Sequence, residues 1–74
     1  MEIKPGIYRH YKGNEFEVIC VGLHEDTKER LVVYKALSRI GEFEEGTIWI
    51  RPLASFVEQV EVDGKMAPRF RKIG

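Results

Sequence analysis

The sequence predicts a mainly β fold, a small SH3-like five-stranded barrel with one short helix or 3₁₀ turn. β-branched and aromatic residues recur in short runs that glycine and polar residues separate at close intervals, which is the pattern of an antiparallel sheet. At 74 residues, the chain has room for one compact core and too few strands for a sandwich. We therefore expect a single small β-barrel domain over residues 1–74, ordered from about residue 5 to about residue 73.

The first predicted element is a hairpin. Residues 7–11 and 15–23 are rich in β-forming side chains, and residues 12–14 supply the turn. A three-residue loop at this turn would place Arg9 opposite Glu17, which is a complementary pair of charges. The hairpin should therefore be stabilised by its turn and by this pair.

The side chains of the hairpin are expected to alternate between a core face and a solvent face. On the first strand, Tyr8 and His10 should point inward, and Arg9 and Tyr11 should point outward toward a candidate binding surface. Beyond Val18 the second strand is apolar on both faces. This predicts a long strand that bends and gives its two halves to different parts of the core.

Two more strands are predicted in the middle of the chain. Residues 31–37 contain branched and aromatic side chains typical of a third strand. Residues 47–51 alternate and predict a short fourth strand. The fourth strand divides its side chains between two faces, with Ile48 and Ile50 on one face and Trp49 and Arg51 on the other.

Pro52 should end the fourth strand and open a helical turn, because its fixed φ suits the first helical position. Leu53, Phe56 and Val57 then fall at i, i+3 and i+4 on one stripe. Residues 51–59 are therefore predicted to form a short helix or 3₁₀ segment that plugs one end of the barrel. Phe56 should be fully buried in this plug.

The end of the chain predicts a second hairpin. Asp63-Gly64 is a strong two-residue turn signal, and residues 60–62 alternate before it. Residues 66–73 should return as a last strand that Pro68 interrupts. Because proline cannot donate a hydrogen bond to a neighbouring strand, this last strand belongs at an edge of the sheet.

Composition limits the classes of function. Twelve basic residues balance twelve acidic residues, which removes the bulk electrostatic argument for a nucleic-acid binder. Cys20 is the single cysteine, so an intramolecular disulfide and a multi-cysteine zinc site are excluded, and the thiol fits a reducing compartment. With neither a signal-peptide pattern nor a run of about 18 apolar residues, we expect a cytoplasmic protein without membrane contact.

Few residues could carry metal or nucleophilic chemistry. A site of His10, Cys20 and His24 can be drawn, but their spacing matches no zinc pattern. Cys20 stands mid-strand among apolar neighbours, where a thiol is expected to be buried and unreactive. We expect His10 to be a half-buried strand residue and His24 a loop residue. No paired carboxylates in an apolar setting and no phosphate-loop spacing occur, so we predict no cofactor, no metal and no enzymatic activity.

The residues best suited to bind a ligand are aromatic and arginine side chains. Flat rings beside guanidinium groups suit a peptide as well as an unpaired nucleobase with its phosphate. A purely structural interpretation is also open, in which Tyr34 and Trp49 are core residues and the arginines pair with glutamates such as Glu15. The predicted ligand-binding residues are Arg9, Tyr11, Tyr34, Trp49, Arg51 and Arg69.

Three functions follow from this surface. The first is a non-enzymatic binding module whose partner is a protein or peptide segment. The second is a weak binder of single-stranded RNA or DNA, or of a nucleotide, that stacks bases on Tyr34 and Trp49 and contacts phosphates through Arg51, Arg69 and Arg71. An enzyme, or a subunit that regulates one, ranks last.

Four motifs in order, GIYRHYKG, VVY, WIRPL with a following F, and PRF, resemble a small bacterial family, domain of unknown function 1653. The resemblance extends from about Pro5 to Ile73. It implies a compact bacterial stand-alone domain and supplies no established activity. The family's motif residues fall on Gly6, Tyr8, Arg9, His10, Tyr11, Lys12, Gly13, His24, Tyr34, Trp49, Arg51, Pro52, Phe56, Arg69 and Phe70.

Overall fold

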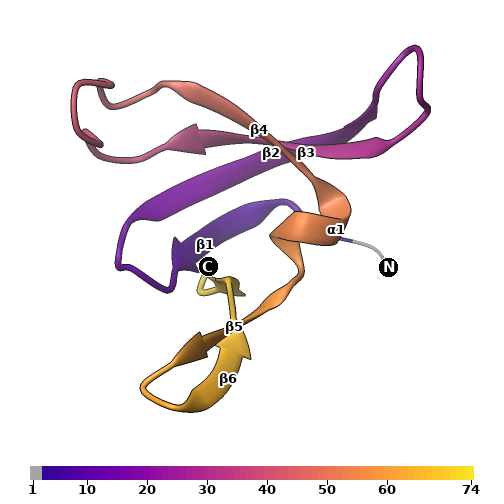
Figure 1. Ribbon diagram of the computed structural model, residues 1–74. Coiled ribbons are helices and arrows are strands. Elements are labelled where there is room, and N and C mark those ends of the chain that lie inside the picture. Colours follow the sequence, from indigo (N-terminus) through magenta and orange to yellow (C-terminus); the bar gives the residue numbers. More distant parts are fainter. Residues whose placement is uncertain (1–2) are drawn as a thin grey trace.

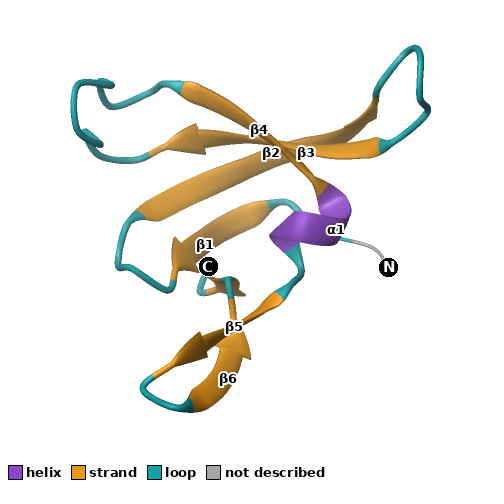
Figure 2. Cartoon of the chain, viewed as in Figure 1, coloured by secondary structure: helices purple, strands orange, loops and turns teal. Residues whose placement is uncertain are grey.

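Residues 3–74, the part of the chain that the computed structural model describes, are mainly β with one short helix (Figures 1 and 2). The predicted domain also includes residues 1 and 2, which lie outside the described residues. No helix within residues 3–74 is both long and apolar enough to cross a membrane. The elements in chain order are β1 (Gly6–His10), β2 (Glu15–Leu23), β3 (Arg30–Ala36), β4 (Ile48–Pro52), α1 (Leu53–Phe56), β5 (Gln59–Val62), β6 (Lys65–Pro68) and β7 (Phe70–Lys72).

The strands form two antiparallel sheets. Five strands pair in the order β4-β3-β2-β1-β7, and β5 and β6 form a separate hairpin that extends away from the larger sheet (Figure 1). The prediction of a mainly β fold with one short helix is confirmed. Within residues 3–74 no pairing joins the edge strands β4 and β7, so closure into an SH3-like barrel stays a prediction.

The register of the first hairpin differs from the prediction. Arg9 lies opposite Glu15 rather than Glu17, because the three-residue loop spans residues 11–13 instead of 12–14. His10 closes this loop through backbone hydrogen bonds with Asn14 and Gly13. A loop of this length needs positive φ at its third residue, and Gly13 has φ of 110°. The displacement moves each partner by two residues, so every side chain keeps its predicted face.

The second strand bends where the sequence predicts, but its outer half does not enter the core. The pairing of β2 with β3 shifts between Val18 and Cys20, which marks a β-bulge. Beyond the bulge the side chains that were expected to be buried are exposed: Ile19, Cys20, Val21 and Leu23. The predicted burial of this half, including the Cys20 thiol, is therefore wrong.

An aromatic cluster forms the centre of the core. The buried residues are Tyr8, Phe16, Val18, Val32, Tyr34, Ala36, Phe56 and Phe70. The Phe56 ring stacks on the Phe70 ring with centroids 4.0 Å apart, and 1% of Phe56 is exposed. The predicted burial of Phe56 is confirmed, and the helix that carries it covers Leu53–Phe56 rather than the longer predicted range.

The remaining predictions of local structure hold with one change. Pro52 directly precedes α1, and Asp63 and Gly64 both have positive φ in the turn between β5 and β6. The predicted last strand is two strands. Pro68 ends β6, whereas β7 turns to pair with β1 at the edge of the larger sheet.

Candidate functional site

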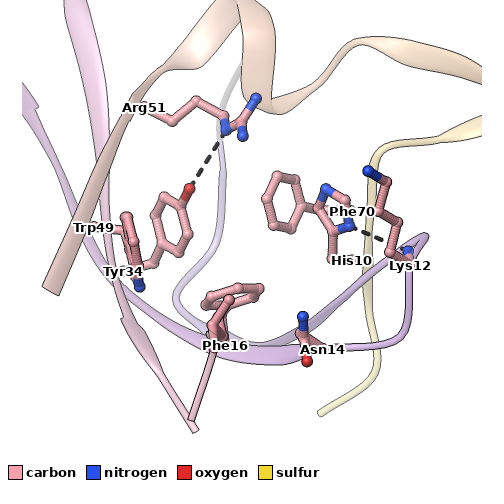
Figure 3. Close-up of a pocket in the computed structure, with 9 residues that line it drawn as sticks. His10, Lys12, Asn14, Phe16, Tyr34, Trp49, Arg51 and Phe70 are labelled. Atoms are coloured by element: carbon pink, nitrogen blue, oxygen red, sulfur yellow. Dashed lines mark hydrogen bonds between the residues drawn. The ribbon is translucent and has the colours of Figure 1, made fainter. Parts of the chain in front are cut away.

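An open cleft of about 250 Å³ lies beside the aromatic core, where the first hairpin faces β3 and β4 (Figure 3). We call it the aromatic cleft. It contains rings and cations, and no acidic side chain lines it among the described residues. The lining residues are His10, Lys12, Asn14, Phe16, Tyr34, Ile40, Trp49, Arg51 and Phe70.

Edge-to-face aromatic contacts build the floor of the cleft. Phe16 lies 5.1 Å from Tyr34 and 5.8 Å from Phe70, and Tyr34 lies 5.6 Å from Phe70, all between ring centroids. Tyr34 is 5% exposed and also meets Phe56 from the other side of the core. The Tyr34 ring is therefore a core residue that phenylalanine rings enclose, and Tyr34 also lines the cleft.

Trp49 stands beside Tyr34 as its cross-strand partner on β4. It is half-buried and packs against the core. The Phe43 ring contacts it edge-to-face, with the ring centroids 5.1 Å apart. Its indole Nε1–H is enclosed and has no hydrogen-bond partner among the described residues. Trp49 thus forms a wall of the cleft rather than an open platform.

The Arg51 guanidinium lies above this floor in a fixed position. Its Nε donates to Tyr34 Oη at 3.4 Å (Figure 3). Its Nη1 donates to Ser55 Oγ on α1 at 3.0 Å. The guanidinium carbon is 5.6 Å from the centre of the Phe70 ring. Both hydrogen-bond partners are neutral, and Arg51 forms no salt bridge within residues 3–74. No carboxylate within residues 3–74 therefore neutralises the positive charge of Arg51.

His10 forms the opposite wall of the cleft. Its Nδ1 accepts a hydrogen bond from the Lys12 backbone N–H at 3.1 Å (Figure 3), and its ring packs 4.9 Å from Phe70. Burial lowers the pKa of His10 below its usual value, and the nearby charges of Arg51, Arg69 and Lys12 lower this pKa further. The ring is therefore neutral near pH 7, with its proton on Nε2.

Arg9 and Tyr11 lie outside the aromatic cleft. Both are exposed, and Arg9 Nη2 is 2.8 Å from the Glu15 carboxylate. With Arg71 they line a second depression of about 250 Å³, which meets the cleft at His10. The predicted surface is thus divided in two, with Tyr34, Trp49 and Arg51 on one side of His10 and Arg9 and Tyr11 on the other.

Arg69 has a structural position between the last strands and α1. Its Nε donates to the Ser55 carbonyl oxygen at 3.1 Å, and its Nη2 is 2.6 Å from the Glu58 carboxylate. Its charge is therefore paired already. Arg69 acts on the cleft at most through its effect on the pKa of His10.

Comparison with known proteins identifies the family. The family model described as "Protein of unknown function (DUF1653)" matches residues 6–72. The chain belongs to this family. It is also similar to the crystal structure of a DUF1653 protein from Bordetella bronchiseptica, with a TM-score of 0.83 and 32% identity over 99% of this chain and 90% of that chain. No curated protein matches the sequence.

The stretches of sequence that suggested the family supply several of the residues that line the cleft. GIYRHYKG supplies His10 and Lys12, and WIRPL supplies Trp49 and Arg51. The predicted binding residues did not include the other six lining residues. Lys12, Asn14 and Ile40 lie outside the strands, whereas His10, Phe16 and Phe70 lie on β1, β2 and β7. On the first hairpin, the prediction that His10 points inward was the feature of the sequence that indicated the face where the cleft lies.

The residues with metal or thiol chemistry in this DUF1653 protein lie apart from one another. Among residues 3–74 no three His, Cys, Asp or Glu side chains gather as a metal-binding group. His24 is an exposed loop residue, as predicted, and its Nδ1 accepts the Asp26 backbone N–H at 3.2 Å. Cys20 lies opposite Val33 after the bulge, away from the cleft lining.

Proposed function

We propose that this protein is a non-enzymatic binding module that takes up a protein or peptide segment in the aromatic cleft. The observation that carries the proposal is Arg51, a half-buried guanidinium that two hydroxyl groups hold over an aromatic floor. A concave apolar floor with a few convergent polar groups is the usual form of a small-group binding site. The volume of about 250 Å³ suits one inserted side chain.

The packing of the rings supports a protein segment over a stacked nucleobase. Phe16, Phe56 and Phe70 surround the Tyr34 ring, so Tyr34 offers no free face for stacking. The twelve basic and twelve acidic residues also give the chain no net charge to attract a polyanion. An inserted side chain would use the apolar floor and leave the aromatic packing intact.

A single-stranded nucleic acid or a nucleotide is the second candidate, and the second depression favours it. Arg9 and Arg71 lie directly opposite each other on β1 and β7, beside the exposed Tyr11 ring. Like charges in directly opposite positions repel each other. The Glu15 carboxylate already pairs with Arg9, so Arg71 is the charge without a carboxylate partner within residues 3–74. A phosphate at the two arginines with a base on Tyr11 would satisfy this arrangement.

We also infer the architecture and setting that the sequence predicts. The five-stranded antiparallel sheet, its bulged long strand and the short helix packed against the core support an SH3-like barrel. The single unpaired Cys20 supports a cytoplasmic location, and the likeness to a Bordetella bronchiseptica protein supports a bacterial domain. Fractionation of the source cells would test the location.

Amide NMR titrations of the ¹⁵N-labelled chain test the function. Three kinds of probe are used: single-stranded oligonucleotides, mononucleotides and pools of hexapeptides. Each hexapeptide pool has one fixed residue at its centre. If the proposal is right, peptide pools shift the amides of His10, Lys12 and Arg51. Arg51→Gln should abolish these shifts, and Arg30→Gln is the matched control because Arg30 is exposed at the far end of β3.

Two results would contradict the peptide proposal. One is a cleft that no peptide pool perturbs at millimolar concentration. The other is a set of oligonucleotide shifts at Arg9, Tyr11 and Arg71 that disappear as salt rises, since phosphate contacts weaken steeply with salt. The second result would establish the nucleic-acid alternative instead.

A further inference from the structure

The hydrogen-bonding groups of the aromatic cleft are mostly donors. Two of the five guanidinium N–H groups of Arg51 are engaged, and three remain. The Tyr34 hydroxyl accepts from Arg51 and donates to no group among the described residues. The neutral His10 ring holds a proton on Nε2, and Lys12 adds an ammonium group without a salt bridge within residues 3–74. A ligand that only accepts hydrogen bonds would complement this set.

The positive charge of the cleft also favours a ligand that only accepts hydrogen bonds, namely an anion. Around the first hairpin and α1, Arg9, Lys35 and Arg69 have carboxylate partners, in the pairs Arg9–Glu15, Lys35–Glu17 and Arg69–Glu58. The two cations that line the cleft, Lys12 and Arg51, have no carboxylate partner within residues 3–74. Arg51 is half-buried and has two hydroxyl partners instead. A partly buried cation without an anion carries a desolvation cost that a bound anion offsets.

On these grounds we propose that the cleft recognises a carboxylate attached to an apolar group. The carboxylate binds the unused N–H groups of Arg51, with the Tyr34 hydroxyl as a second donor, and the apolar group lies on the floor formed by Phe16 and Phe70. An ionised carboxylate is an acceptor-only group that matches the planar guanidinium in a bidentate way. This inference rests on the proposed function, because it names the chemistry of the segment that the cleft takes up.

Two sources can present this chemistry: the free C-terminus of a chain that ends in an apolar residue, and an aspartate or glutamate next to one. The cleft meets the same carboxylate in both cases. The two sources differ in whether amidation of the peptide C-terminus removes the charge, so a pair of matched peptides separates them.

The experiment compares three small probes that share a phenyl ring: phenylacetate, phenylacetamide and phenyl phosphate. Binding is followed by NMR through the backbone amides of the cleft and the Trp49 indole N–H. We expect phenylacetate to bind at least tenfold more tightly than phenylacetamide. Arg51→Gln should remove this preference, Arg51→Lys should retain part of it because the charge remains without the planar fork, and Arg30→Gln should leave it unchanged.

Each outcome decides one question. Equal affinity for phenylacetate and phenylacetamide would overturn the carboxylate inference and leave the peptide-binding proposal in place. Tighter binding of phenyl phosphate than of phenylacetate would overturn it in favour of a phosphate ligand. If neither these probes nor the peptide pools perturb the cleft, the proposed function fails as well. A tetrapeptide ending in phenylalanine, tested as free acid and as amide, then identifies the source of the carboxylate.

Discussion

The two halves of β2 have opposite environments, and the more apolar half, after the bulge, is the more exposed one. In the half before the bulge, 2% of Val18 is exposed, whereas in the half after it 37% of Val21 and 65% of Leu23 are exposed. The pairing explains the difference, because β1 pairs with β2 up to Val18 and no farther. Beyond that point β2 pairs with β3, and the hairpin of these two strands extends beyond β1 (Figure 1). Burial here depends on which neighbours cover a strand, and not on its own hydrophobicity.

The largest expected effect is at the centre of the covered region. Phe56→Ala should destabilise the protein by about 3 to 5 kcal/mol, because it removes a ring that stacks on Phe70 and leaves a cavity. Since a domain of this size holds only a few kcal/mol in total, the variant should be largely unfolded at 37 °C. Thermal and urea melts by circular dichroism measure this. A melt within a few degrees of wild type would show that α1 does not close the core.

Tyr8→Ala comes next, because Tyr8 lies on the covered face of the first hairpin and meets the Phe56 ring at 5.6 Å between centroids. Its hydroxyl also donates to the Lys4 carbonyl oxygen at 2.7 Å. We expect a loss of about 3 kcal/mol or more. Tyr8→Phe is the matched control and should cost about 1 kcal/mol, since only this hydrogen bond is lost. Equal losses in the two variants would mean that the ring contributes little packing.

A pair of identical substitutions tests the comparison itself. Val18→Ala should cost about 2 kcal/mol because the side chain is buried before the bulge, and Val21→Ala should cost less than about 0.5 kcal/mol because it lies beyond it. The free energies of unfolding of the two variants, from urea denaturation, decide the matter. If Val21→Ala is as costly as Val18→Ala, the outer half of β2 is covered in solution by something that the described chain does not contain.

His10 is half-buried at the edge of the core, and this burial lowers its pKa. Burial, followed by the charges of Arg51, Arg69 and Lys12, lowers the pKa of this side chain. The unfolded chain therefore binds a proton more readily than the folded chain, so stability should fall as the pH drops from about 6.5 through the folded pKa. Above this range His10 should contribute no pH dependence.

Unfolding melts between pH 5 and pH 8 measure this effect. His10→Gln should flatten the decline in stability below about pH 6.5. The control His24→Gln, at an exposed loop position, should retain it. A decline that persists unchanged in His10→Gln would assign the acid sensitivity to other groups.

Much of the fold could be predicted because local patterns determine it. Alternation gave the faces of Tyr8 and Val18, and proline and glycine gave the helix start and the second turn. The register of the first hairpin was wrong because it depends on which loop residue takes positive φ, and the position of Gly13 in the loop was misassigned. The exposure of Cys20 could not be predicted, because it depends on where β1 stops pairing with β2.

Part of the candidate site could be predicted from the alternation of side chains along the strands. Tyr34, Trp49 and Arg51 come together because they lie on one face of two adjacent strands. Lys12 and Ile40 reach the cleft from loops, where alternation gives no information. The placement of Arg9 on the other side of His10 depends on the pairing of β1 with β7, which joins distant parts of the sequence.

The smallest expected effect is at Arg9, which lies on the first hairpin as Tyr8 does but faces solvent. Arg9→Ala removes an exposed ion pair with Glu15, so it should change the free energy of unfolding by less than about 0.5 kcal/mol. Because Arg9 lines the second depression and not the aromatic cleft, the variant should also keep the affinity of the cleft for phenylacetate. Loss of that affinity would show that the two surfaces bind one ligand together. If Arg9→Ala instead lowers the free energy of unfolding as much as Tyr8→Ala does, the first strand faces the other way, because only the loss of a buried side chain has so large an effect.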